Sequence, residues 1–152
     1  MASSTTQHTA LTNLAVQLAA RSHMTTNNVA VCSGPHPLGF HGAQSSIELW
    51  ATEVDEDWAM LGARSTEEVY TIHGGITAWS AGASEAAIVA ARDTAVDIYQ
   101  ELQAQLRTDP ALNSAVRVAR IARATIDQWF DDTGRLCQVE FWIRCEQRLS
   151  GS

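Results

Sequence analysis

The sequence of 152 residues contains no lysine, and its ten arginines face 17 acidic residues, which gives a formal net charge of −7. Static binding of nucleic acid rests on a basic surface that releases counterions, so this balance argues against a protein that holds phosphates. No apolar run approaches the ~20 residues of a membrane helix. The N-terminus also lacks the basic start and the unbroken apolar segment of a secretory signal. We therefore expect a soluble, intracellular protein with no membrane contact.

The chain has only three cysteines, which do not suit a disulfide scaffold. Cys137 and Cys145 are predicted on one strand, eight residues apart, hence about 27 Å at ~3.3–3.4 Å per residue. A disulfide needs α-carbons within ~7 Å of each other. We expect reduced, buried thiols.

Motifs of catalysis are also missing, because the sequence holds no P-loop, dinucleotide fingerprint or nucleophile elbow. Cys32, His36 and His41 have the spacing C-x3-H-x4-H, but a structural zinc site wants four ligands and usually a compact pair. His73 is predicted on a strand, as a packed or hydrogen-bonded side chain. We therefore expect no catalytic residue, no cofactor and no metal.

What the sequence does contain predicts one domain, 1–152, with two clear helices. Apolar residues recur at helical spacing over 5–22 and again over 84–107, where Ser84 is the expected N-cap and Asp109-Pro110 the stop. The predicted buried stripe of the second helix is Ile88, Ala91, Ala95, Ile98, Leu102 and Leu106.

Alternating or β-rich runs predict the strands. They lie at 27–33, 47–54 and 67–82, and in a C-terminal hairpin whose arms, 114–130 and 135–149, flank a turn. Between the first two runs, 34–46 reads as a loop. Gly74 and Gly75 suggest a bulge or a close backbone approach. The expected fold class is α+β: an antiparallel or mixed sheet of about five strands, with an N-terminal helix and one long central helix packed on it.

Acidic residues at 53–57 and 67–68 flank a short apolar patch that contains Trp58 and Leu61. Placed in a polar connection between strands, these acids would stay ionised, as a solvated rim or as a contact surface. Aromatic residues on the polar side of strands favour the contact, and Trp50 and Trp142 both have that parity.

A second candidate patch is the arginine stretch that enters the C-terminal hairpin, at Arg117, Arg120 and Arg123. Without interleaved aromatic residues it is no nucleic-acid surface. Arginine binds carboxylates bidentately, so these residues could pair with the acids of 53–57 or 67–68, in the same chain or in a neighbouring copy. They are equally well an ordinary charged surface.

Three segments carry a resemblance to known proteins. The first is "EDWAMLGARSTEEVYTIHGGITAWSAG", which holds a W-x-x-L-G-A-R block, and the second is "ARDTAVDIYQELQAQLRTDPALNSAVRVARI", with an R-x-D-P-x-L break. The third is the alternating strand "GRLCQVEFWIRCEQRL". In this order and spacing they resemble the tail terminator proteins of long-tailed phages, in the form found among phages of actinobacteria.

The resemblance covers about residues 56–149 and implies a non-enzymatic virion protein of the tail and neck, assembled in the host cytoplasm. Such proteins form a hexameric ring that caps the major tail tube protein, stops polymerisation and joins the head–tail connector. DNA passes through the ring without specific binding, and an acidic lumen would repel its phosphates. The residues expected at protein interfaces are Trp58, Leu61, Arg64, Glu67, Glu68, Arg117, Arg120, Arg123 and Trp142.

Two alternatives remain open from the sequence. Another neck component, such as a head-closure or connector protein, shares the size, the acidity and the lack of an active site. A small enzyme or ligand-binding domain would instead use the 34–46 loop, with His36, His41 and Trp50. That alternative predicts a concave pocket and a loss of activity when His41 is changed.

Overall fold

The computed structural model describes residues 2–33, 45–60, 65–130 and 134–150, and within them the side chains of all but 2–8, 51–60, 65–68, 129 and 148–150. In chain order the described elements are α1 (Ala2–Ala19), α2 (Ser22–Thr26), β1 (Ala30–Cys32), β2 (Ser45–Met60), β3 (Ser65–Ala81), α3 (Glu85–Thr108), β4 (Val118–Phe130) and β5 (Gly134–Ser150).

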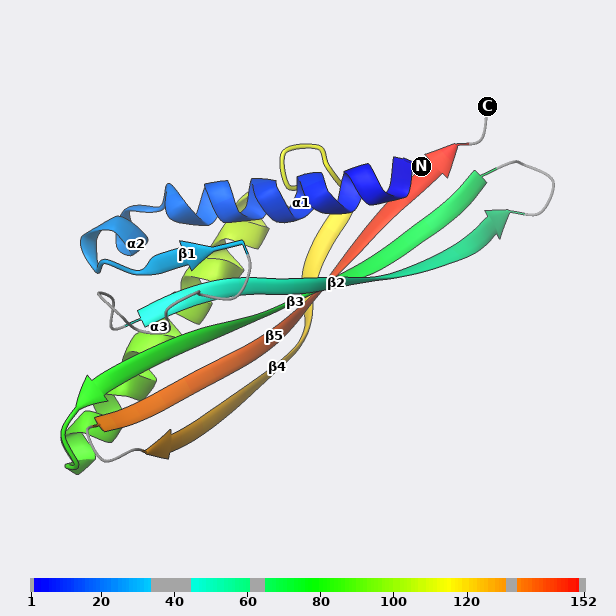
Figure 1. Ribbon diagram of the computed structural model, residues 1–152. Coiled ribbons are helices and arrows are strands. Elements are labelled where there is room, and N and C mark those ends of the chain that lie inside the picture. Colours follow the sequence, from blue (N-terminus) through cyan, green and yellow to red (C-terminus); the bar gives the residue numbers. More distant parts are fainter. Residues whose placement is uncertain (1, 34–44, 61–64, 131–133, 151–152) are drawn as a thin grey trace.

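The five described strands form one mixed sheet in the order β1-β2-β3-β5-β4. β1 runs parallel to β2, and the remaining neighbours are antiparallel. Figure 1 shows α3 crossing behind the strands and α1 lying along the upper side of the sheet. The α+β class, with an N-terminal helix and a long helix packed on the sheet, is confirmed.

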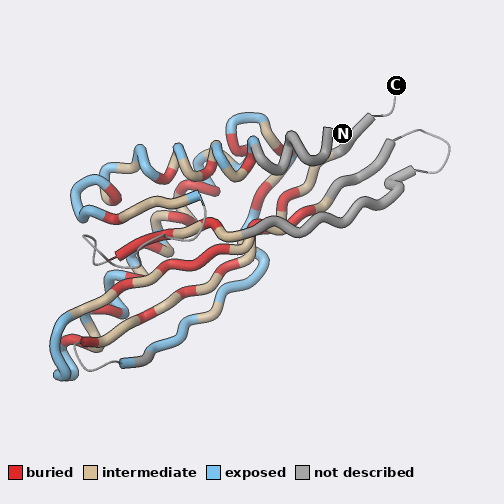
Figure 2. Tube along the Cα trace, in the orientation of Figure 1, coloured by how far each residue is buried: buried red, intermediate tan, exposed pale blue. Residues whose placement is uncertain are grey.

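A single core lies between the sheet and the two long helices. Alternate residues of β3 and β5 point into it, among them Tyr70, Ile72, Ile76 and Ala78 and the row from Cys137 to Cys145. The helices contribute Leu14 and Leu18 from α1 and most of the predicted stripe of α3. Figure 2 shows this alternation of buried and half-buried residues along the central strands.

Helix α3 begins and ends where its sequence predicts. The Ser84 hydroxyl accepts a hydrogen bond from the Ala87 backbone N–H (3.2 Å), and Asp109 is the C-cap. One stripe residue differs from the prediction, because Ile88 is only half-buried while Ala87 is buried. The first turn of α3 therefore leaves part of its apolar side uncovered.

The N-terminal helix differs from the predicted 5–22, because α1 ends at Ala19 and the short α2 follows. Arg21, between them, donates hydrogen bonds to the Glu101 carboxylate and to Gln105 Oε1 (2.8 Å) on α3. Gln17 reaches Asp109 Oδ2 from α1 at 2.8 Å. These polar contacts fix the two helices side by side on the sheet.

β2 and β3 are longer than the sequence indicated. The acids at 55–57 and 67–68 lie on paired strands and not in a connection between them, since Glu56 is the register partner of Glu68 and Asp57 that of Glu67. Like charges directly opposite each other destabilise a sheet. On the other side of β3, Glu67 is the register partner of Arg148 on β5.

Candidate interaction surface

The face of the sheet opposite the helices carries an ordered aromatic cluster. His73 on β3 stacks on Trp142 of β5, with ring centroids 4.8 Å apart and planes 9° from parallel. Trp50 of β2 meets the edge of His73, also at 4.8 Å between centroids. His73 is therefore packed between two indoles, as expected for a histidine on a strand.

A backbone irregularity places Trp50 in this cluster. The β2–β3 register shifts between Leu49 and Ala51, so Trp50 is the bulged residue. The Trp50 ring then lies over Gly75, where an added Cβ would be 2.7 Å from Trp50 Cη2. The close approach suggested by the two glycines is confirmed, and the bulge lies across from them on β2.

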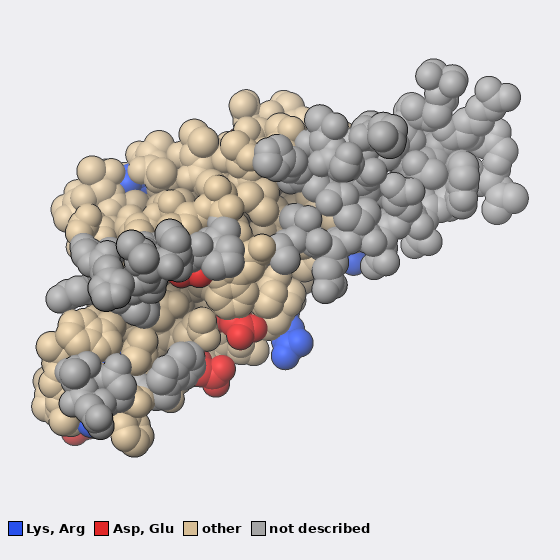
Figure 3. Space-filling model, in the orientation of Figure 1, with Lys and Arg blue, Asp and Glu red and all other residues tan. Residues whose placement is uncertain are grey.

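Carboxylates hold the cluster in place. Trp50 Nε1 donates to Glu48 Oε2 at 2.8 Å, and His73 Nε2 lies 3.3 Å from Glu140 Oε2. On its other side Trp142 is covered by Arg123, whose guanidinium carbon is 4.7 Å from the ring centroid. The described part of this face therefore mixes acidic and basic groups, as Figure 3 shows, around a filled aromatic centre.

The three arginines expected at an interface have different environments. Arg117 Nη2 contacts Glu146 Oε2 at 2.9 Å, and Arg144 contacts the other oxygen of the same carboxylate at 3.0 Å. The hydrogen bond from Arg144, followed by the charges of both arginines, lowers the pKa of Glu146 below its ordinary value. Arg120 is exposed, and among the described residues no carboxylate lies within ion-pair distance of it.

The three thiols differ in how accessible they are. Cys32, Cys137 and Cys145 are free. Burial raises the pKa of each thiol, and that of Cys145 reaches about 12. Because the thiolate is the reactive form, the buried Cys137 and Cys145 are the least reactive of the three, while Cys32 is partly exposed. No group of three or more possible metal ligands occurs among the described residues.

The edge strand β4 is the most exposed part of the described sheet. Its only neighbour in the sheet order is β5, and Figure 2 shows the second half of the strand exposed. Ile126 and Phe130 share the helix-facing parity, yet 54% and 74% of their surfaces are accessible. In the part of the chain whose side chains are described, the one other large apolar residue this exposed is Val16 on α1, at 64%.

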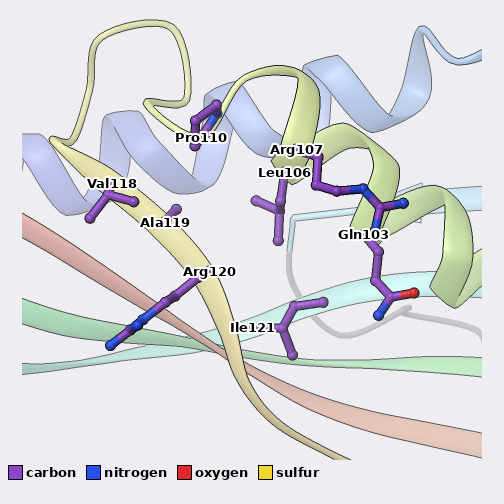
Figure 4. Close-up of a pocket in the computed structure, with 8 residues that line it drawn as sticks. All are labelled: Gln103, Leu106, Arg107, Pro110, Val118, Ala119, Arg120 and Ile121. Carbon is purple, nitrogen blue, oxygen red and sulfur yellow. The ribbon is translucent and has the colours of Figure 1, made fainter.

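Two grooves open between α3 and β4. The first, of about 360 Å³, is lined by Gln103, Leu106, Arg107, Pro110, Val118, Ala119, Arg120 and Ile121. Figure 4 shows Leu106 and Ile121 facing each other across it, while Arg107 and Arg120 extend away on opposite sides. The second, of about 260 Å³, is lined by Ile88, Gln128, Phe130, Arg135 and Leu136. We use the name α3–β4 seam for the surface made of these two grooves and the exposed side chains of Ile126 and Phe130 on β4.

The structure describes the side chains of only some of the residues that the sequence predicted at an interface. Trp142 is in the aromatic cluster, and the three arginines lie on or just before β4. Trp58, Glu67 and Glu68 have described backbone on β2 and β3 but undescribed side chains. Leu61, Arg64 and the histidines of the 34–44 segment lie outside the described residues.

Sequence reasoning missed the apolar side of the seam. The run "TIDQWF" shows the alternation of Ile126 and Phe130 that marks one face of a strand. Such a pattern normally predicts burial, and nothing in it reveals that α3 diverges from this edge. Nothing in the sequence around Arg107, apart from its position near the end of a helix, predicted that it would line a groove.

No described helix is long and apolar enough to cross a membrane. Comparison with models of known protein families and with curated proteins finds no match to this chain.

Proposed function

We propose that this chain is a virion structural protein that forms a ring on the end of a phage tail tube, stops tube growth and joins the tail to the head connector. The proposal starts from the three sequence segments that resemble tail terminators. It is supported by the described part of the structure, whose distinctive features are exposed surfaces suited to contact.

The observation that carries the proposal is the separation of charge across the sheet. β2 holds five acidic residues, β3 holds two, and neither contains an arginine. At the far edge, β4 holds Arg120 and Arg123 with a single acid, Asp127. A subunit with complementary opposite sides can contact its neighbour head to tail, and such contacts generate closed rings when the rotation closes.

The ordered outer face fits the same role. Helices cover one side of the sheet, and the other side keeps its aromatic cluster filled by its own residues, with Arg123 and His73 against Trp142. A filled, polar-rimmed face suits contact with a cylinder or an open channel better than capture of a small ligand. The net charge of −7 per copy favours passage of DNA without adhesion.

Disrupting the gene in its phage tests the proposal. A ring that stops polymerisation is needed for length control, so particles without it should carry tubes of irregular, excessive length with no attached head. Restoring the gene from a plasmid should restore uniform tails. Tails of normal length that merely fail to join heads would refute the terminator role and favour a head-closure or connector protein.

A further inference from the structure

The α3–β4 seam combines three properties that are rare on the surface of a protein with no partner there. In the described part of the chain it has the edge strand of the sheet, two of the three most exposed large apolar side chains, and one groove beside each end of that strand. Exposed strand edges with apolar rows promote association, and proteins usually protect them.

Only the first half of the β4 edge is protected. The Ala119 backbone N–H donates to the Pro110 carbonyl oxygen (2.7 Å), and the register shift between Ile121 and Arg123 bulges the strand. Beyond that point the pairing with β5 is regular from Ala124 to Phe130. The unprotected half is the half that bears Ile126 and Phe130.

The charges of the grooves specify the chemistry of the partner. Among the described residues that line them are Arg107, Arg120 and Arg135 and no acid, in a chain where acids outnumber arginines 17 to 10. Arg135 lies over the Phe130 ring, 5.1 Å from its centroid, and donates to the Ala83 carbonyl at 3.0 Å. An apolar floor with basic rims fits an acidic segment that also carries apolar side chains.

This chain itself contains such a segment. The run "EVDEDWAM" on β2, residues 53–60, has four acids next to a tryptophan and a methionine. In the sheet order, β3 and β5 separate β2 from β4. One copy therefore presents the acidic strand on one side and the seam on the other, as a head-to-tail contact requires.

We propose that the α3–β4 seam receives the acidic β2 side of a second copy of this chain, with Phe130 and Ile126 as the apolar centre and Arg120 as a charge partner. The inference rests on the proposed ring, because it names the contact between neighbouring subunits. Compared with the prediction from the sequence, the basic side of the contact no longer includes Arg117, because Arg117 already pairs with Glu146. The apolar residues of β4 are added to it.

Sedimentation over a concentration series, with the full chain, measures the contact through the self-association constant. Phe130→Asp should weaken self-association at least tenfold, and Ile126→Ser should weaken it less. Val16→Asp is the matched control: an exposed apolar residue on α1, outside the seam, whose change should alter association by less than twofold. Urea unfolding of each variant verifies that the fold is kept.

A charge swap identifies the partner segment. Arg120→Glu and Asp55→Arg should each weaken association, and the double variant should recover most of the loss, because each contact then regains an opposite pair. Equal effects of Phe130→Asp and Val16→Asp, a double variant no better than the singles, or a wild-type chain that stays monomeric to about 1 mM would overturn the proposal.

The two proposals fail in different ways. If the seam variants assemble normally but the gene disruption gives over-long tails, the terminator role stands and the seam is wrong. If the variants lose self-association while tail length does not depend on the gene, the seam stands as a contact between copies and the terminator role is wrong.

Discussion

Gly74 marks the tightest point of the sheet, and replacing it tests the packing on which the outer cluster depends. A Cβ at this position would meet the Glu48 carbonyl oxygen of β2 and the ring of Phe141, at 2.6 Å from Phe141 Cζ. Phe141 is fully buried, and the carbonyl belongs to the backbone of a paired strand. Neither neighbour has room to move.

The expected cost of Gly74→Ala follows from two opposing effects. Overpacking a rigid site costs about 1–3 kcal/mol, and a contact with backbone lies at the upper end. Replacing glycine removes freedom from the unfolded chain and returns about 0.4–1 kcal/mol. We therefore expect a net loss of about 2 kcal/mol in the free energy of unfolding.

Urea denaturation followed by tryptophan fluorescence measures this loss. Gly75→Ala is the matched control, because the three atoms nearest its added Cβ all belong to the ring of Trp50, a half-buried side chain on the outer face. It should cost at least 1 kcal/mol less than Gly74→Ala, since a ring at the surface can rotate away. Equal costs for the two variants, or a stabilised Gly74→Ala, would refute the close approach of β2 and Phe141 to this glycine.

Two further predictions concern titration and thiol chemistry. The pKa of Glu146 is lower in the folded chain than in the unfolded one, so the pairing stabilises the fold above the unfolded pKa and this contribution is lost as pH falls through the folded pKa. Glu146→Gln should therefore lower the free energy of unfolding near pH 7, and this loss should shrink as pH falls through the folded pKa, as urea titrations over a pH series will show; a loss that does not change with pH would contradict the ion pair with Arg117 and Arg144. Among the cysteines, the partly exposed Cys32 should react with a thiol reagent in the native state. Cys145 is buried and has a pKa of about 12, so it should react only after unfolding. Prompt labelling of Cys145 in the native state would show that this strand is misplaced.

The sequence predicted the elements whose signals are local and repeated. The stripe of α3 and the alternation from Cys137 to Cys145 each repeat a period several times, and both match the structure except at Ile88; the Ser84 cap also matches. Boundaries were less certain where the signal is weak. β2 continues to Met60 because pairing with β3 holds charged residues in a strand that their own preferences would not extend.

The outer cluster was only partly predictable, because it depends on the register between strands. Parity placed Trp142 on the polar face, and it lies there. The stacking of His73 on Trp142 needs β3 and β5 to pair at that register, which no single strand encodes. The bulge at Trp50 likewise arises from the pairing with β3, across from two glycines whose lack of side chains leaves space for the ring.

Exposure at the β4 edge is the property that the sequence predicts least well, and it is also the one that bears most on the proposed contact between copies. A strand with Ile126 and Phe130 on one parity predicts burial in any sheet that a helix covers completely. α3 is a single helix across a sheet with five described strands, and its apolar stripe follows β3 and β5, so the edge strand remains uncovered. If that row were merely a tolerated surface, replacing Phe130 with a polar residue would leave assembly unchanged. Because the exposed row, the bare strand edge and the acid-free grooves coincide, covering them requires an acidic, partly apolar surface, and the opposite side of the same chain supplies one.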